Sequence, residues 1–201
     1  MFGTIHVLDF EGNQEFGVVE FGIVTLVNLE ISGCVGVGCR SKSGTFISRD
    51  FREHSRINNE ADDEVEFSDH VSKFVLLRRS GIFCAHSSQT EKSLLRSYMP
   101  TPGLVLRFYA SGLTSSWDPW IDTKLLYRRC FPNIRNYSLM ALITRCNLRS
   151  ALDEVSGKYC PVYKCKPHNA LYDALASALL LMNFIKISKI TSLVDLVEIC
   201  L

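Results

Sequence analysis

The sequence has almost no net charge. Its 22 Lys and Arg residues balance 21 Asp and Glu residues, which leaves a formal net charge of +1. A global electrostatic attraction to a polyanion is therefore excluded, and any nucleic-acid binding must depend on a local patch. The candidate patch combines basic residues with two phenylalanines: Arg40, Lys42, Phe46, Arg49, Phe51, Arg52 and Arg56. A solvated loop is the alternative, because Asp50 and Glu53 interrupt this stretch.

Long apolar runs, internal repeats, low-complexity tracts and linkers are also lacking. The longest apolar stretch, Ala174 to Ile185, is too short to cross a bilayer, so it predicts a buried helix and no membrane contact. A chain of 201 residues without a linker is expected to form one domain, residues 1–201. The start Met1-Phe2-Gly3 shows no signal-peptide pattern, and the eight cysteines lie singly, so we expect reduced thiols and a cytoplasmic location.

The distribution of β-rich and helical patterns predicts a mixed α/β sheet. Runs at 4–10, 18–27 and 34–41 predict three strands, whose short connections favour an antiparallel meander. Further strands at 81–85 and 120–123 alternate with helices. These helices are expected to begin near Ser68, Thr90, Asp122, Asn136, Asn169 and Thr191. Residues 104–117 remain undecided between a strand and a Gly/Ser loop.

Three acidic positions stand at or near predicted strands. Asp9 and Glu11 are two apart on the first strand, so their side chains leave the same face. The strand is otherwise apolar, and unpaired acids in a buried strand are costly, which argues against a merely solvated strand end. Glu91 lies in the first turn of a helix just after a buried strand, which aims it at the same sheet edge. Stabilisation of the helix dipole is the alternative for Glu91.

His168 and Asp173 precede and open a long apolar helix. Either residue alone reads more simply as a histidine near a helix start and a solvent-facing aspartate. The whole set changes that interpretation, because four carboxylates that fold together raise one another's pKa unless a cation compensates. Mg²⁺ and Mn²⁺ prefer carboxylate oxygen, and a nearby histidine can deprotonate water at neutral pH. The pattern predicts two-metal phosphodiester chemistry.

In order and spacing, these motifs resemble the DEDDh branch of the DnaQ-like 3′–5′ exonucleases. The first motif is VLDFEG, the second is GIFCAHSSQTEKSLL with His86 and Glu91, and the third is HNALYDALA, in which four residues separate His168 from Asp173. Two flanking pieces agree: Trp120-Ile121-Asp122-Thr123 resembles a short family strand, and NYSLMALITRCNL resembles a family helix. The resemblance covers about residues 4 to 185.

The resemblance implies a ribonuclease H-like fold, with a five-stranded mixed sheet whose first three strands are antiparallel and whose two faces carry helices. It implies two Mg²⁺ or Mn²⁺ ions held by Asp9, Glu11, Glu91 and Asp173, with His168 as general base. Substrate-binding residues would be Phe10, Gly12, Asn13 and His86. The substrate would be the 3′ end of single-stranded DNA or RNA, shortened to nucleoside 5′-monophosphates, and a polymerase or repair complex would be a further partner.

Three positions depart from the family pattern, and the departure at Glu91 is the best argument for a rival interpretation. Glu91 stands where aspartate is usual, Ser87 stands where asparagine commonly follows the histidine, and Gly12-Asn13 replaces the usual Thr-Thr-Gly. A longer side chain at position 91 would shift the second ion or alter metal preference. The rival is a nucleic-acid-binding or polymerase-associated module that kept the fold and lost efficient chemistry. The choice between a DNA-directed enzyme and an RNA-trimming exoribonuclease also stays open.

Overall fold

The computed structural model describes residues 2–42 and 65–201 of the chain. Most of the predicted basic patch, Phe46, Arg49, Phe51, Arg52 and Arg56, lies outside these described residues. The role of that patch in nucleic-acid binding therefore stays a prediction.

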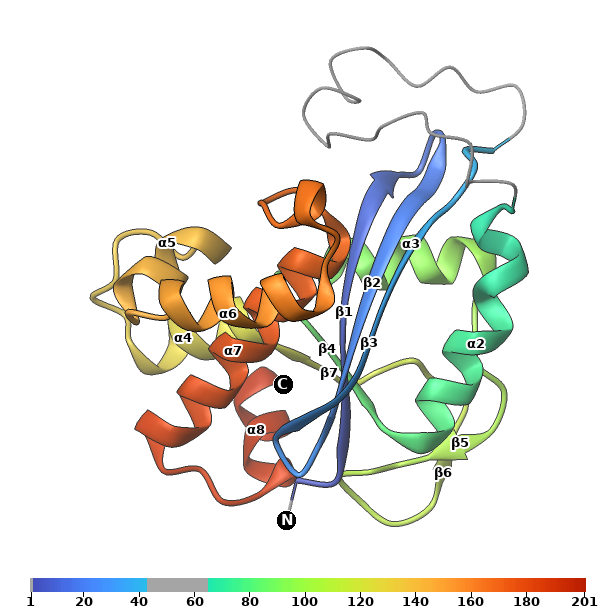
Figure 1. Ribbon diagram of the computed structural model, residues 1–201. Helices are drawn as coiled ribbons and strands as arrows, with labels where there is room; N and C mark the ends of the chain where they lie inside the picture. Colours follow the sequence, from blue (N-terminus) through green and yellow to red (C-terminus); the bar gives the residue numbers. More distant parts are fainter. Residues whose placement is uncertain (1, 43–64) are drawn as a thin grey trace.

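A five-stranded mixed sheet forms the centre of the molecule, in the order β3-β2-β1-β4-β7 (Figure 1). The three antiparallel strands are β1 (Thr4–Asn13), β2 (Gly17–Val27) and β3 (Glu30–Gly38). The two shorter strands, β4 (Ile82–Ala85) and β7 (Trp120–Asp122), run parallel to β1. The predicted fold class is confirmed. The undecided stretch 104–117 forms a separate two-stranded hairpin, β5 (Val105–Leu106) and β6 (Leu113–Thr114).

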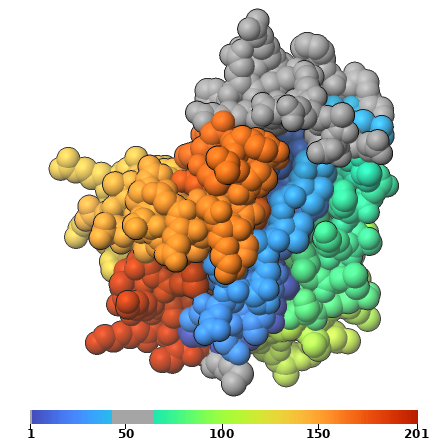
Figure 2. Space-filling model, viewed as in Figure 1, coloured from blue at the N-terminus to red at the C-terminus, as the bar shows by residue number. Residues whose placement is uncertain are grey.

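Helices cover both faces of the sheet, as expected (Figure 1). One face carries α4 (Thr123–Cys130), α5 (Leu139–Arg145), α6 (Arg149–Tyr159), α7 (Ala170–Ser188) and α8 (Leu193–Cys200). The other face carries α2 (Phe67–Ser80) and α3 (Gln89–Tyr98), which bury an aromatic cluster. The edge strand β3 stays exposed between the two helical layers (Figure 2).

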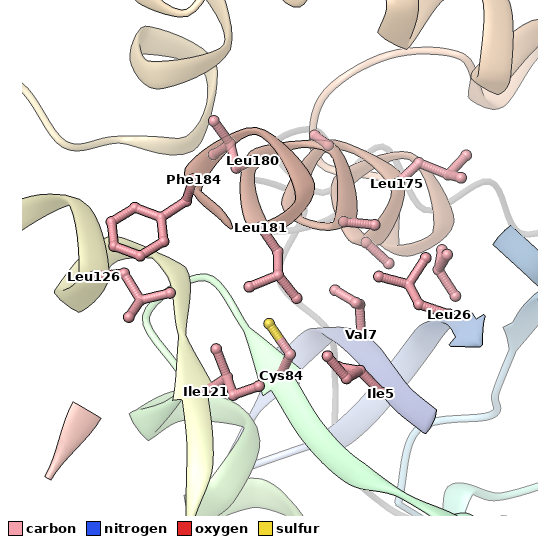
Figure 3. Close-up of a cluster of buried hydrophobic side chains, with 14 of the residues drawn as sticks. Ile5, Val7, Leu26, Cys84, Ile121, Leu126, Leu175, Leu180, Leu181 and Phe184 are labelled. Atoms are coloured by element: carbon pink, nitrogen blue, oxygen red, sulfur yellow. The ribbon is translucent and has the colours of Figure 1, made fainter. Parts of the chain in front are cut away.

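Helix α7 forms the centre of the larger core. Its residue Leu181 lies above Val7, Cys84 and Ile121 from three neighbouring strands (Figure 3). By length and composition alone α7 could cross a membrane, but 72% of its most apolar window is buried inside the protein. The apolar stretch of the sequence is thus a core helix.

A close approach between β2 and α7 fixes the position of that helix. A Cβ atom on Gly22 would lie 2.2 Å from the carbonyl oxygen of Ala170, closer than any real contact. Gly22 pairs with Asp9 in the β1–β2 register, so the missing side chain lets the start of α7 approach the sheet beside Asp9. The glycine therefore brings the third motif next to the first.

Several helix starts differ from the expected ones. Helix α2 begins at Phe67, one residue before the predicted cap Ser68, and includes that buried phenylalanine. Helix α3 begins at Gln89 instead of after Thr90, and α5 begins at Leu139, because Asn136 Oδ1 accepts from Ser138 N in a local turn. Asn side chains make turns as readily as caps, which explains the error at Asn136. The predicted cap Asp122 is confirmed, since its carboxylate accepts from Leu125 N.

Substituting Gly22 by alanine should displace the start of α7. We expect the free energy of unfolding to fall by about 1–3 kcal/mol, as for other overpacked cores. The matched control is Gly33→Ala on β3, where a Cβ meets no atom within 4 Å. Urea unfolding measures both variants, and equal stabilities would contradict the close approach.

Candidate active site

Strands β1 and β2 place three carboxylates on the face that α7 covers. Asp9 and Glu11 alternate with core residues along β1, and Glu20 on β2 is paired directly with Glu11. Directly opposed residues of an antiparallel pair project to the same face. Glu20 is only 4% exposed. The sequence interpretation missed Glu20, although an acid inside the apolar run of β2 carries the same signal of costly burial as Asp9 and Glu11.

Helix α7 and the segment before it supply the third motif. Asp173 is buried in the first turn of α7, and its Oδ2 accepts a hydrogen bond of 2.9 Å from the backbone N of His168. His168 has a φ of 63°, in the left-handed region, and its side chain is exposed. The carboxylate of Asp173 thus holds the backbone turn that presents the histidine.

The structure brings Glu11, His168 and Asp173 into one group. One potential ligand atom from each lies within 4.8 Å of the others, and this is the single such group of three found among residues 2–42 and 65–201. Asp9 and Glu91 adjoin the group, since the charges of Asp173, Glu11 and Glu91 all act on the Asp9 carboxylate. The three sequence motifs therefore meet at one place.

Burial and mutual repulsion raise the pKa of every carboxylate in the group. The pKa of Asp9 lies well above its ordinary value, first because of burial and then because of Asp173, Glu11, Glu91 and Glu20. Burial, then Asp173 and Glu20, raise the pKa of Glu11 to about 7. Burial, with Glu20 adding to it, raises the pKa of Asp173 to about 7 against the hydrogen bond from His168.

Glu91 completes the group from α3. It is 5% exposed, and burial, together with the charges of Asp122 and Glu11, raises the pKa of its carboxyl to about 8. Its Oε2 and the Oδ1 of Asp173 are buried without a hydrogen-bond partner in the protein. Buried carboxylate oxygens normally have partners, so the two oxygens and the surrounding acids fit a divalent cation that prefers oxygen ligands. The assignment of these residues as metal ligands stays a prediction.

A network around β7 fixes the turn that leads from β4 to Glu91. The Asp122 carboxylate accepts from Ser87 N at 3.2 Å and from Ser88 N at 2.8 Å, and also caps α4. The hydroxyl of Ser88 donates to the same carboxylate instead of capping α3. The one carboxylate of Asp122 thus binds both the turn between β4 and α3 and the first turn of α4. It thereby holds the start of α3, and with it Glu91, against the sheet.

His86 belongs to the same network. Its Nε2 lies 2.9 Å from Tyr137 O and its Nδ1 lies 2.9 Å from Thr123 Oγ1. A carbonyl only accepts, so Nε2 carries the proton, and in the neutral ring Nδ1 accepts from the threonine hydroxyl. Burial lowers the pKa of His86 to about 4, which keeps the ring neutral near pH 7.

The residues predicted to bind substrate are dispersed. Phe10 points to the opposite face, where its ring packs against Phe67 and Phe74. Asn13 Oδ1 closes the β1–β2 turn by accepting from two backbone amides. Gly12 follows the register shift after Glu11, and both ring nitrogens of His86 have protein partners. Substrate contacts by these four residues stay predictions.

The fold is that of known 3′-exonucleases. No protein-family model and no curated protein matches the sequence. Among solved structures, exonuclease X in complex with 5′-overhanging duplex DNA is 22% identical, with a TM-score of 0.68 over 96% of this chain and 99% of that one. The nuclease domain of 3′hExo, a DEDDh family member bound to rAMP, is 16% identical, with a TM-score of 0.61 over 92% of both chains.

A third likeness involves a longer protein. The zinc-bound form of the E. coli ExoI–ssDNA complex is 11% identical, with a TM-score of 0.62 over 94% of this chain and 41% of that one. The chain thus has the ribonuclease H-like fold of these 3′-exonuclease structures across nearly its whole length. At these identities the likenesses establish the fold alone.

The raised pKa values predict that the metal-free protein loses stability as pH rises. The folded pKa values of Glu11, Asp173 and Glu91 exceed the ordinary values, so the native state binds more protons than the unfolded chain between those values. The melting temperature in EDTA should therefore fall from about pH 5 to about pH 8, and Mn²⁺ should restore it most at the higher pH. Glu91→Gln should flatten this dependence. A melting temperature that rises over the same pH range would contradict the raised pKa values of these carboxyl groups.

Proposed function

We propose that the chain is a metal-dependent 3′–5′ exonuclease that hydrolyses phosphodiester bonds at the 3′ end of single-stranded DNA or RNA and releases nucleoside 5′-monophosphates. The observation that carries this proposal is the convergence of Asp9, Glu11, Glu91 and Asp173 beside His168, with two buried carboxylate oxygens left without protein partners. The fold shared with 3′-exonucleases supports it.

The four acids would hold two Mg²⁺ or Mn²⁺ ions. Asp9, Glu11 and Asp173 would surround one ion, and Asp9 with Glu91 would serve the other. When bound, such ions neutralise phosphate charge and stabilise the attacking and leaving oxygens of an in-line displacement. The protein contributes a group of carboxylates from β1, α3 and α7. Their mutual repulsion and burial raise their pKa values, so they do not all stay ionised without a bound cation.

His168 is the proposed general base. Its side chain is exposed and close to Glu11 and Asp173, so it can reach water at the rim of the group. In its neutral form the imidazole can accept a proton from that water, as histidine does in general-base catalysis. Asp173 fixes the backbone of this residue, which limits where the ring can lie.

The substrate is proposed from the site and from the molecules in the similar structures. Exonuclease X was solved with duplex DNA that has a 5′ overhang, and the 3′hExo domain with rAMP. Another match concerns recognition of the histone mRNA stem-loop by a 3′-exonuclease. DNA and RNA ends are thus both substrates to test, with a polymerase or repair complex as a further partner in the cytoplasm.

The non-catalytic module is the second candidate, and Glu91 was its best argument. Glu91 is buried, the charges of Asp122 and Glu11 act on its carboxylate, and its Oε2 has no hydrogen-bond partner in the protein. A residue that had lost its role would be expected to turn to solvent or to find a partner. The position of Glu91 therefore favours the enzyme.

Replacing His168 by alanine should lower kcat by about 10²- to 10⁴-fold, the usual contribution of a general base. Because the side chain is exposed, the melting temperature should stay close to that of the wild type. A fluorescent-oligonucleotide ladder assay on DNA and RNA with Mg²⁺ or Mn²⁺ measures the rate. Full activity of the variant would remove His168 from this role, and binding without shortening by the wild type would favour the module.

Glu91→Gln should reduce activity most strongly at low metal concentration, since it removes one carboxylate charge while keeping the length of the side chain. Glu91→Asp, which restores the residue usual in the resembled family, is the matched comparison and should retain more activity than Glu91→Gln. The ladder assay over a Mn²⁺ titration measures both. An unchanged metal dependence of Glu91→Gln would place this carboxylate outside the metal site.

A further inference from the structure

Glu20 is a fifth carboxylate near the candidate site, and it lies on the sheet face that α7 covers. Its partner comes from the segment that carries His168. Lys164 Nζ lies 3.1 Å from Glu20 Oε1. The glutamate side chain is 6% exposed and the lysine side chain 30%. Since 144 positions separate the two residues in the sequence, this ion pair joins two remote parts of the chain.

The segment between α6 and α7, residues 160–168, is here called the His168 loop. It includes the short 3-10 turn η1 (Val162–Lys164). Several of its bonds tie it to the flanking helices: the thiol of Cys165 donates to Ser156 O, Asn169 Nδ2 donates to Lys166 O, and His168 N donates to Asp173 Oδ2. The Lys164 ion pair connects the loop to the sheet. The orange loop accordingly lies beside β1 and β2 in Figure 1.

His168 needs such an external support. Its side chain is exposed, so burial does not fix the ring. Its backbone lies in the left-handed region, which is unfavourable for a residue with a Cβ and persists only when the surroundings hold it. A loop attached to its own helices alone could move relative to Glu11, which belongs to the sheet.

We propose that Glu20 and Lys164 are a positioning pair that holds the His168 loop against the sheet and so sets where the His168 imidazole lies over the carboxylates. The catalytic consequence rests on the proposed function, whereas the structural consequence does not. The Lys164 ammonium group is paired with Oε1 of Glu20, so the glutamate influences the His168 loop through Lys164. The lysine also compensates a buried charge beside Glu11 that would otherwise be costly.

Hydrogen exchange of the loop tests the structural part without substrate. In Lys164→Met, the amides of residues 160–169, apart from the prolines at 161 and 167, should exchange about tenfold faster than in the wild type, because one coupled contact is lost. The amides of α8 serve as the internal reference. Lys164→Arg, which keeps charge and reach, should behave like the wild type, as should Lys166→Met, a matched control on the same loop. Unchanged exchange in Lys164→Met would overturn the proposal.

Steady-state kinetics test the catalytic part. Lys164→Met should lower kcat by about 10- to 100-fold, the effect of a small misplacement of a catalytic group. The KM for an oligonucleotide should change by no more than roughly twofold, because the pair does not touch substrate. Lys164→Arg should restore kcat. A defect confined to KM, or an equal loss in Lys166→Met, would show that the loop lysines contact the substrate instead.

A double variant and a milder one complete the test. Glu20→Gln combined with Lys164→Met should be no worse than Lys164→Met alone, since both remove one interaction; additive losses would contradict a pair. If Lys164→Met fails to fold, Glu20→Gln, which keeps an oxygen acceptor, supplies the same two measurements. If the wild type lacks nuclease activity, the proposed function fails, while loop exchange still decides whether the pair holds the loop.

Discussion

The crowding of five carboxylates around strands β1 and β2 is the constraint on which the site depends. Asp9, Glu11, Glu20, Glu91 and Asp173 come from β1, β2, α3 and α7, and burial and mutual repulsion raise the pKa of those at its centre. Such an arrangement is unfavourable for a protein alone and can persist only if the surrounding fold holds it. On the proposed function, bound cations would offset this cost. The Glu20 carboxylate is instead compensated by a positive charge of the protein itself, the ammonium group of Lys164.

The fold holds this face together by contacts that are themselves specific. Gly22 lets the start of α7 reach the sheet next to Asp9. Asp122 accepts hydrogen bonds from the amides of the turn that leads into α3, and so fixes the first turn that carries Glu91. Asp173 binds the backbone of His168. Each motif is therefore fixed by a polar or steric contact with another segment, while the apolar core beneath α7 provides the rigid support.

The sequence was sufficient for the sheet and for the motifs, and insufficient for the turns. Alternation along β1 and the apolar length of α7 are local signals, and they predicted the placement of Asp9, Glu11 and Asp173 correctly relative to their elements. The helix start at Asn136 was misplaced, because this side chain closes a local turn instead of capping a helix. Helix α2 begins at Phe67, before the expected cap Ser68. The Glu20–Lys164 pair could not be predicted, since no local pattern links residues so far apart in the sequence. The sequence analysis also failed to predict helix α6.

The two carboxylate oxygens of Asp173 have different environments. Oδ2 accepts from the backbone of His168, whereas Oδ1 is buried among the acids without a protein partner. One side chain thus couples the geometry of the proposed base to the electrostatics of the proposed cation site. Amidation of this residue would perturb both at once, so its phenotype could never be apportioned between ligand loss and a misoriented ring. Dissecting those contributions requires substitutions elsewhere, on residues that serve a single purpose.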